Sequence, residues 1–584
     1  MLAEDVFERL HHHLVRIYGE ETAERTTPRL LELMEDFRPP GRRAGAVPDP
    51  VLFDETDVWL IAYGDHVTEP AQAPLGTLRD FLARHTDGAV TGLHLLPHYP
   101  ATSDDGFAVA DFAAVDPALG EWSHVEALAA DHRLMLDAVF NHTSASHPWF
   151  TGWLADDPRF RDFYLDVDPA TDLASVVRPR TSPLLTPFET TTGTRHVWTT
   201  FSADQVDLNY ANPEVLLAVT AELLRYLGHG ARMLRLDAVA FLWKEPGTSC
   251  IHLPQTHEII RLWRAVVDAV APGTLLVTET NVPHRENVTY FGSGQDEAHL
   301  VYQFALPPLT LATFRSGDAH RLADWAAGLE TPSTRTTFLN FLASHDGIGV
   351  RPVEGILDDA EIADLCEGVR RAGGQVSYRT RPDGDQSPYE LNAVYLDALA
   401  HPEPEDQARE VDRFVAAHSV LLSLAGVPLL YLNSLFGSRS WTEGVERTGR
   451  ARTINRQRFG RAEIEAELDD PSSLRRQVLD RLLHRIRIRT AEPAFHPNAA
   501  QTVLDGGPST LALQRTPTDG GPPVLCVHDV SGRPGRFRSR PVDRLPPGAA
   551  LVDLGDGSEH RVEVDGTIDV DLPAYGVRWL KPAG

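Results

Sequence analysis

Residues 230–244 read GARMLRLDAVAFLWK, an apolar run that contains one arginine and one aspartate. If the run is a β-strand, its period of two places Met233, Arg235 and Asp237 on one face and Leu234 and Leu236 on the other. A buried arginine and a buried carboxylate are costly unless they serve each other or a ligand. The guanidinium would keep the carboxylate ionised and oriented, as a nucleophilic carboxylate requires. A purely structural ion pair is the alternative interpretation, and the neighbouring segments decide between the two.

Similar apolar runs recur from residue 57 onward and alternate with longer segments of helical periodicity. Besides the segment above, these are VWLIAYG from Val58, VTGLHLLP from Val90, LMLDAVFNH from Leu134, TLLVTETN from Thr274, VYQFALPP from Val301, TFLNFLASHD from Thr337 and VPLLYLNS from Val427. Eight strand-plus-helix units predict an α/β fold, the (β/α)8 TIM barrel.

The first 56 residues read as a helical N-terminal extension. A first helix would place four apolar residues on one face: Phe7, Leu10, Leu14 and Ile17. A second helix is predicted after Thr27-Pro28, because proline is favoured in a first helical turn. The three successive histidines from His11 point in three directions around a helix, so we do not expect them to bind one metal ion.

The remaining segments divide around the barrel. Short alternating runs separated by Gly and Pro predict an antiparallel, β-sandwich-like domain at the C-terminus. Two long interruptions of the barrel have the length of functional lids. The predicted map is the extension at 1–56, barrel parts at 57–142, 206–346 and 401–494, an inserted loop domain at 143–205, acceptor-site loops at 347–400 and the β domain at 495–584.

Polar residues gather where the predicted strands end, which is where TIM-barrel enzymes carry their catalytic groups. These ends carry the carboxylates Asp237, Glu279 and Asp346 and the imidazoles of His142 and His345. Two carboxylates flanking a bond perform glycosyl transfer, one attacking the anomeric carbon while the other protonates the departing oxygen. A third could stabilise oxocarbenium charge, and imidazoles could hydrogen-bond sugar hydroxyls. Alternatively, His142 only caps a strand end and His345 is a rim residue.

Two further polar features of the strands have other interpretations. Asp137 lies within the third strand, so we expect it to orient an arginine or histidine. His94 and His98 have a metal-binding spacing only on a helix, and Pro97 argues against a helix there.

The composition limits the partners of the protein. Its 584 residues carry a net charge of −29, which repels nucleic acid and anionic membranes, so an anionic substrate would require a local cluster of arginines. No apolar run reaches 18 residues and the N-terminus lacks signal-peptide features, which favours a cytoplasmic enzyme. Cys250, Cys366 and Cys526 lack metal-ligand spacing and are expected to be reduced. We expect no metal, no cofactor, and a monomer or homodimer.

Four motifs carry a family resemblance. DAVFNH, MLRLDAV, TETN and ASHD resemble the four ordered sequence regions of the alpha-amylase superfamily. The segments SDDGF (103–107), KEPGTSC (244–250), FALPPL (304–309), SHDGIGV (344–350) and ARTINR (451–456) resemble the sucrose phosphorylase branch of that superfamily. The resemblance runs from about residue 57 to about residue 460.

The resemblance implies roles for matching residues. Asp237 is the implied nucleophile, Glu279 the general acid/base and Asp346 the stabiliser of the transition state. Asp104, His142, Arg235, His345 and Arg452 match positions that grip glucose, and Phe107 and Phe201 match aromatic positions that line the same pocket. The family would thus form a glucosyl ester on Asp237 and retain the anomeric configuration.

Arginines distinguish a phosphorylase from a hydrolase. The loop VVRPR (176–180) supplies Arg178 and Arg180, and it matches an arginine-bearing acceptor loop of sucrose phosphorylases. A solvated basic turn is the alternative interpretation. Two positions depart from the sucrose enzymes, with Val177 in place of a tyrosine and Glu390 in place of a glutamine.

The acceptor-side loops, the N-terminal extension and HDGIGVRPVEG are most similar to the glucosylglycerate phosphorylases of this branch. Those enzymes convert 2-O-α-glucosyl-D-glycerate and phosphate to α-D-glucose 1-phosphate and glycerate, and Arg351 or Arg195 could bind the acceptor carboxylate. Alternatives within the branch are sucrose, sucrose 6'-phosphate and glucosylglycerol phosphorylases. From other classes, an α-glucosidase or transglucosidase and a non-catalytic amylase-like module stay open, although the module would be expected to lack some of the three carboxylates.

Overall fold

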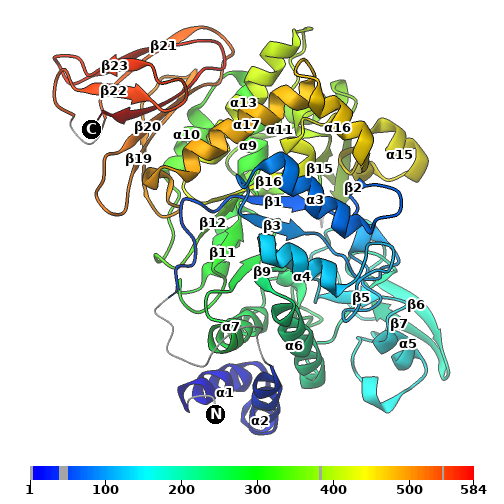
Figure 1. The fold of residues 1–584 in the computed structure, drawn as a ribbon. Helices are drawn as coiled ribbons and strands as arrows, with labels where there is room; N and C mark the ends of the chain where they lie inside the picture. The colour runs from blue at the N-terminus through cyan, green and yellow to red at the C-terminus, as the bar shows by residue number, and fades with distance from the viewer. Residues whose placement is uncertain (1–3, 38–49, 381–384, 542–544, 584) are drawn as a thin grey trace.

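The structure of the protein, a computed structural model, describes residues 4–37, 50–380, 385–541 and 545–583. At its centre, eight parallel strands close into a barrel in the order β1-β16-β12-β11-β10-β9-β4-β3 (Figure 1). Their bounds are β1 (Trp59–Ala62), β3 (Gly92–Leu95), β4 (Arg133–Ala138), β9 (Ala231–Leu236), β10 (Leu275–Thr278), β11 (Leu300–Tyr302), β12 (Thr337–Asn340) and β16 (Val427–Tyr431). Each strand overlaps one of the eight apolar runs, so the TIM-barrel prediction is confirmed.

Helices cover the outside of the barrel. Asn212 caps α6 (Pro213–Gly228) by accepting a hydrogen bond from the Glu214 backbone N–H, and a proline occupies the first helical turn. Prolines likewise begin α3 (Pro74–Thr86) and α7 (Pro254–Val270). The other covering helices are α4 (Trp122–Asp131), α9 (Leu306–Ser316), α10 (His320–Ala327), α13 (Gln407–Ser423), α16 (Arg461–Asp469) and α17 (Leu474–Thr490).

The strand register brings the polar residues of the barrel together. Arg235 on β9 lies opposite Asp137 on β4. Asp237 follows the last residue of β9 and Glu279 the last residue of β10, and their backbone N–H groups still bond to the neighbouring strand. The two carboxylates therefore leave adjacent strands at the same end of the barrel.

Two insertions lie at that end of the barrel. The first contains α5 (Pro148–Leu154), β5 (His142–Ser144), which pairs with β8 (Gln205–Asp207), and β6 (Leu185–Thr190), which pairs with β7 (Gly193–Trp198). The second contains α11 (Asp359–Arg371) and a sheet of β13 (Ile348–Gly349), β15 (Gln386–Asn392) and β14 (Gln375–Thr380). The polar stretch 373–386 contains β14 and the first residue of β15, and its residues 381–384 lie outside the described part.

The N-terminal extension is a helical hairpin, α1 (Glu4–Tyr18) and α2 (Glu20–Asp36), that lies against α6 and α7 (Figure 1). His13 Nδ1 and Arg16 Nε lie 2.9 and 2.8 Å from the carboxylate of Glu258 on α7, so a hydrogen bond and an ion pair hold the hairpin in place. The histidine run thus serves packing, since His11 likewise contacts Thr27 of α2 at 3.0 Å.

Two details of the predicted hairpin are wrong. The second helix begins at Glu20 and contains Pro28 in its interior, where packing of α2 against α1 and α6 supports the helix. Phe7 is 41% exposed, so the buried face of α1 consists of Leu10, Leu14 and Ile17 alone.

The C-terminal domain is antiparallel, as predicted, and contains two sheets. The larger has the order β18-β19-β20-β25-β22-β23 and the smaller pairs β21 with β24. Apolar residues such as Val527 and Phe537 form a separate core there. The strands are β18 (Ala500–Leu504), β19 (Thr510–Thr516), β20 (Val524–Asp529), β21 (Gly535–Ser539), β22 (Ala550–Asp553), β23 (Glu559–Arg561), β24 (Ile568–Leu572) and β25 (Val577–Pro582). The alternating runs that predicted this domain were STLALQR, PPVLCVHDV, AALVDLG, HRVEVDG, TIDVDL and VRWLKP, and they include neither β18 nor β21.

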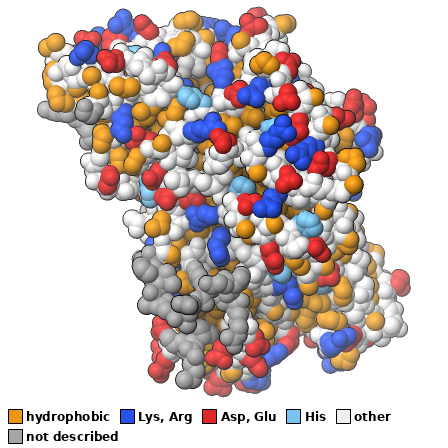
Figure 2. Space-filling model, viewed as in Figure 1, with side chains coloured by type: hydrophobic (Ala, Val, Ile, Leu, Met, Phe, Trp, Pro, Cys, Tyr) orange, Lys and Arg blue, Asp and Glu red, His pale blue; other side chains and the backbone are white. Residues whose placement is uncertain are grey.

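The molecular surface mixes charges of both signs. Figure 2 shows acidic and basic side chains interspersed over one face. Within the described ranges, no helix is long and apolar enough to cross a bilayer.

Gly92 begins β3 and offers a test of barrel packing. A Cβ atom added there would lie 2.2 Å from a ring carbon of Trp59, which is fully buried on β1. Gly92→Ala should therefore lower the free energy of unfolding by about 1–3 kcal/mol, because an overpacked core strains its neighbours. Thermal and urea unfolding would measure the loss.

Gly328 supplies the matched control. It also has an ordinary backbone conformation, and its added Cβ would have no neighbour closer than 3.6 Å. Gly328→Ala should leave the unfolding midpoint close to that of the wild type. Equal midpoints for Gly92→Ala and Gly328→Ala would contradict the packing argument.

Candidate active site

A cavity opens at the carboxyl end of the barrel strands. Asp237, Glu279 and Asp346 lie in its wall, as the sequence predicts. The other predicted site residues that line it are Asp104, Phe107, His142, Phe201, Arg235, His345, Arg452 and Arg180. Arg178 is the exception, since it does not line this cavity.

Arg235 organises the centre of the site. Its Nη1 donates to Oδ1 of Asp237 and to Oδ1 of Asp137, each at 2.6 Å. The guanidinium carbon lies 5.6 Å from the ring centre of Phe107 and 5.7 Å from that of Tyr302. Two carboxylates and two aromatic rings therefore fix the arginine that orients Asp237.

Asp137 supports Arg235 from behind. Its second oxygen lies 2.8 Å from Nε2 of His94 on β3, and both side chains are fully buried. Burial raises the pKa of Asp137, but the nearby His94 and Arg235 outweigh it and lower the pKa to about 2. An ionised Asp137 can therefore balance the charge of Arg235.

Glu279 has the environment of an acid/base catalyst. Its Oε2 accepts a hydrogen bond from the backbone N–H of Ala238 at 3.1 Å, and its Oε1 lies 4.0 Å from Arg235 Nη2. Burial raises its pKa to about 7; Arg235 opposes the shift, and the carboxylates of Asp237 and Asp346 add to it. Glu279 can thus hold or release a proton near neutral pH.

Asp237 and Glu279 are held as neighbours. Arg235 lies near both carboxylates, and Ala238, the residue after Asp237, bonds to Glu279. Burial raises the pKa of Asp237 above its ordinary value, whereas Arg235 and His142 favour the ionised form. A carboxylate oriented beside a proton donor is the arrangement that retaining glycosyl transfer uses.

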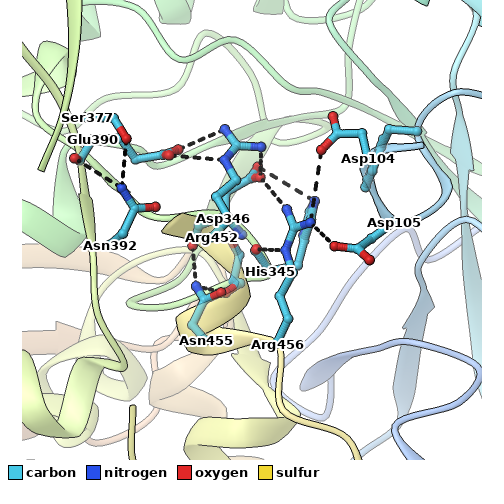
Figure 3. Close-up of polar contacts among 12 residues, drawn as sticks. Asp104, Asp105, His345, Asp346, Ser377, Glu390, Asn392, Arg452, Asn455 and Arg456 are labelled. Atoms are coloured by element: carbon cyan, nitrogen blue, oxygen red, sulfur yellow. Dashed lines mark hydrogen bonds and ion pairs between the residues drawn. The ribbon is translucent and has the colours of Figure 1, made fainter. Parts of the chain in front are cut away.

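Asp346 belongs to a cluster of arginines (Figure 3). Arg452 Nη1 lies 2.5 Å from Asp346 Oδ1, and the same guanidinium donates two hydrogen bonds, at 2.8 and 3.0 Å, to the buried Glu390. Arg456 Nη2 lies 3.5 Å from Asp346. Burial alone would raise the pKa of Asp346, but Arg452, His345 and Arg456 hold it well below its usual range. Asp346 is therefore a fixed negative charge.

His345 contributes a neutral ring. It stacks on Phe107 with the ring centres 4.9 Å apart. Burial, together with the nearby Arg235 and Arg456, lowers its pKa to about 3, although Asp346 partly opposes this. A neutral imidazole can hydrogen-bond a sugar hydroxyl without adding charge.

The loop that carries Asp104 has an unusual backbone. Asp104, Asp105 and Gly106 have φ angles of 53°, 50° and 111°, and a Cβ on Gly106 would lie 2.8 Å from the carbonyl oxygen of Pro97. Gln205 Nε2 donates to Asp104 Oδ2 at 3.3 Å. The loop therefore turns tightly so that Asp104 faces the cavity.

Several residues of the site were missed from sequence. Gln205 supports Asp104, Tyr389 contacts Arg180, and Arg456 Nε donates to the carbonyl oxygen of His345 at 2.7 Å. Arg456 ends the motif ARTINR, so its place in that motif was a usable signal. Gln205 and Tyr389 come from the two insertions and had no comparable signal.

The two arginines considered for the acceptor carboxylate differ in position. Arg351 lines the cavity, where burial lowers its pKa from the usual value. Arg195 lies on β7 outside the cavity lining and pairs with Asp156 at 2.7 Å. Arg351 therefore fits the acceptor role and Arg195 does not.

Lys244 is structural. Its Nζ lies 2.9 Å from Oδ2 of Asp207 and 2.9 Å from Oδ1 of Asn141, both at the base of the first insertion. In the part of the chain that the structure describes, no group of three or more His, Cys, Asp or Glu side chains is arranged to hold a metal ion.

Comparisons with known proteins agree with the geometry. A profile of the alpha-amylase catalytic domain matches residues 86–348. A glucosylglycerate phosphorylase of Allomeiothermus silvanus is 51% identical over 91% of this chain and 94% of its own length. The glucosylglycerate phosphorylase of Escherichia coli is 48% identical over 80% of this chain and 84% of its own length. A sucrose phosphorylase of Agrobacterium vitis is 30% identical over 78% of this chain and 92% of its own length.

The fold has a counterpart among solved structures. The crystal structure of sucrose 6F-phosphate phosphorylase from Thermoanaerobacter thermosaccharolyticum superposes with a TM-score of 0.72 and 23% identity, over 91% of this chain and 100% of the other. The resemblance seen in the sequence motifs is thus confirmed. This chain belongs to the alpha-amylase superfamily and, within it, to the branch of glucosylglycerate and sucrose phosphorylases.

Proposed function

We propose that this protein is a retaining glucosylglycerate phosphorylase. It would convert 2-O-α-glucosyl-D-glycerate and phosphate to α-D-glucose 1-phosphate and D-glycerate. The observation that carries the proposal is the identity of 43–51% to three proteins named glucosylglycerate phosphorylase, against 27–30% to three sucrose phosphorylases. The cavity supports it with three carboxylates and with arginines for two anionic substrates.

The first half-reaction uses the carboxylate pair. An oxygen of Asp237 attacks the anomeric carbon while the bond from that carbon to the glycerate oxygen breaks, and the departing glycerate oxygen takes the proton of Glu279. The products are a glucosyl ester on Asp237, free glycerate and an ionised Glu279. The fixed charge of Asp346 stabilises the oxocarbenium character of the transition state.

The second half-reaction reverses the roles. A phosphate oxygen attacks the anomeric carbon, the ester bond breaks and Asp237 returns to its carboxylate form. Glu279 takes up the proton that the nucleophile gives up. Arg180 and Arg351 border the cavity and suit the phosphate and the glycerate carboxylate, because a guanidinium binds such oxygens in pairs.

The proposal includes three further points. The side chains of the chain itself carry the reaction, with phosphate as co-substrate and no cofactor. The enzyme acts as a monomer or homodimer. It works in the cytoplasm, where its buried thiols Cys250, Cys366 and Cys526 would stay reduced.

The acceptor can be tested directly. Purified protein with α-D-glucose 1-phosphate should release orthophosphate when D-glycerate is present, and much less with D-fructose, fructose 6-phosphate or glycerol. A phosphate assay with each acceptor alone measures this. Preference for another acceptor would change the assignment within the branch. Equal release with and without every acceptor would mean that water is the real partner.

Arg351 should determine the affinity for glycerate. Arg351→Gln should raise the KM for glycerate about tenfold to a hundredfold, because a hydrogen bond to a charged group contributes about 1.5–3 kcal/mol. Arg195→Gln removes the same charge outside the cavity and should leave this KM unchanged. Equal KM values for the two variants would refute the role of Arg351.

Glu279 should set the upper pH limit of the first half-reaction. With a pKa of about 7 it is protonated below neutral pH and ionised above it. The rate of ester formation from glucosylglycerate should therefore fall as pH rises through about 7. Stopped-flow measurement of glycerate release would show this limb. Its persistence in Glu279→Gln would assign it to another group.

The same variant should separate the acceptors. With α-D-glucosyl fluoride as donor, Glu279→Gln should lose transfer to glycerate more than transfer to phosphate, because the alcohol needs a base and phosphate needs little help. Product analysis by anion-exchange chromatography would give both rates. Equal losses would argue against Glu279 as the base.

A further inference from the structure

The inner cavity opens into a second, outer cavity. Five residues line both, among them Asp104, Arg180 and Arg452. The outer cavity adds Glu390, Arg450 and Arg456. Four arginines and two carboxylates thus surround the entrance of a protein whose net charge is −29.

Two of these arginines are already occupied by carboxylates (Figure 3). Arg452 pairs with Asp346 and Glu390. Arg456 pairs with Asp105 and lies 3.5 Å from Asp346. Their charges are balanced inside the protein and are not free for a ligand.

The other two arginines lack such partners. In the described ranges, neither Arg180 nor Arg450 has a carboxylate oxygen within 4.0 Å, although ion pairs are abundant elsewhere in the chain. The two carboxylates that line a neighbouring pocket with Arg450 bind other arginines, because Asp105 pairs with Arg456 and Asp65 pairs with Arg458 at 2.7 Å. The guanidinium carbon of Arg180 lies 5.7 Å from the ring centre of Tyr389, so Arg180 packs against this ring. Among the described residues, Arg180 and Arg450 are therefore the two guanidinium groups lining this cavity that no carboxylate occupies.

We propose that Arg180 and Arg450 form an outer phosphate-binding subsite, in which Arg450 receives incoming orthophosphate and Arg180, which borders both cavities, guides it to the inner site. This inference rests on the proposed function. Arg450 is the new element, since neither the motifs nor the inner cavity indicated it. An acidic protein repels a phosphate dianion in general, so a local pair of unshared guanidinium groups raises its concentration where it is needed.

Partitioning of the glucosyl ester tests the subsite. With α-D-glucosyl fluoride as donor and one subsaturating phosphate concentration, the ratio of glucose 1-phosphate to glucose reports how well phosphate competes with water. Arg450→Ala should lower this ratio about two- to fivefold, the size of one lost exposed charge contact. Arg450→Lys should lower it less and Arg450→Glu more. Added salt should lower the ratio in the wild type more than in Arg450→Ala.

Arg533 provides the matched control. It is an exposed arginine of the C-terminal domain, so Arg533→Ala makes the same charge change far from the entrance. Its ratio should equal that of the wild type. A ratio for Arg450→Ala equal to that of Arg533→Ala would overturn the outer subsite while leaving phosphate-dependent turnover intact.

Binding without turnover separates this subsite from the proposed reaction. Calorimetric titration of orthophosphate into Asp237→Asn should give a lower Kd than the same titration into Asp237→Asn with Arg450→Ala. That difference would support the subsite even if water proved to be the acceptor in turnover. Equal Kd values for orthophosphate in the two variants would overturn the subsite. It would also be overturned if Arg450→Ala weakened the binding of glucose 1-phosphate only, because the site would then bind product and not incoming phosphate.

Discussion

The geometry of the reaction centre depends on one buried guanidinium. Arg235, only 2% exposed, bonds to Asp137 and Asp237 and lies 4.0 Å from Glu279. A buried charge is tolerated when its partners are well placed, and these partners come from β4 and from the ends of β9 and β10. The closed barrel therefore brings the counter-ions together, and the counter-ions fix the nucleophile. His94 on β3 adds one more contact to this network, because its Nε2 lies within hydrogen-bond distance of Asp137.

Asp346 and Glu279 line one cavity, but their pKa values are shifted in opposite directions. Asp346 faces two arginines, which keep it ionised, whereas Glu279 is buried beside two other carboxylates and has a pKa of about 7. The difference follows from position alone, since Glu279 has only a distant contact with Arg235. Environments that separate the pKa values of neighbouring acids assign their roles, one as a fixed charge and one as a proton carrier. Arg452 matters here because Glu390 holds it in place for Asp346.

The sequence predicted the parts of this structure that local pattern encodes. The eight strands followed from apolar runs, and Asp237, Glu279 and Asp346 followed from their places at strand ends. Pro28 within α2 was not predictable, because packing against α1 and α6 overrides the local preference of proline. Gln205 was not predictable for a related reason. It acts through a hydrogen bond to Asp104, 101 residues earlier in the chain, and that contact exists only after the chain has folded.

Net charge and local charge have separate consequences in this protein. An excess of acidic residues over the whole surface favours solubility but opposes the approach of phosphate and glycerate. Arginine, more than lysine, suits a site that must overcome this field, since it stays charged when partly buried and presents paired donors to an oxyanion. Lysine at the entrance would lose charge more readily on burial, as the lowered pKa of the buried Lys244 illustrates. The use of arginine at the entrance is therefore a physical requirement of anionic substrates as well as a consequence of an arginine-rich composition.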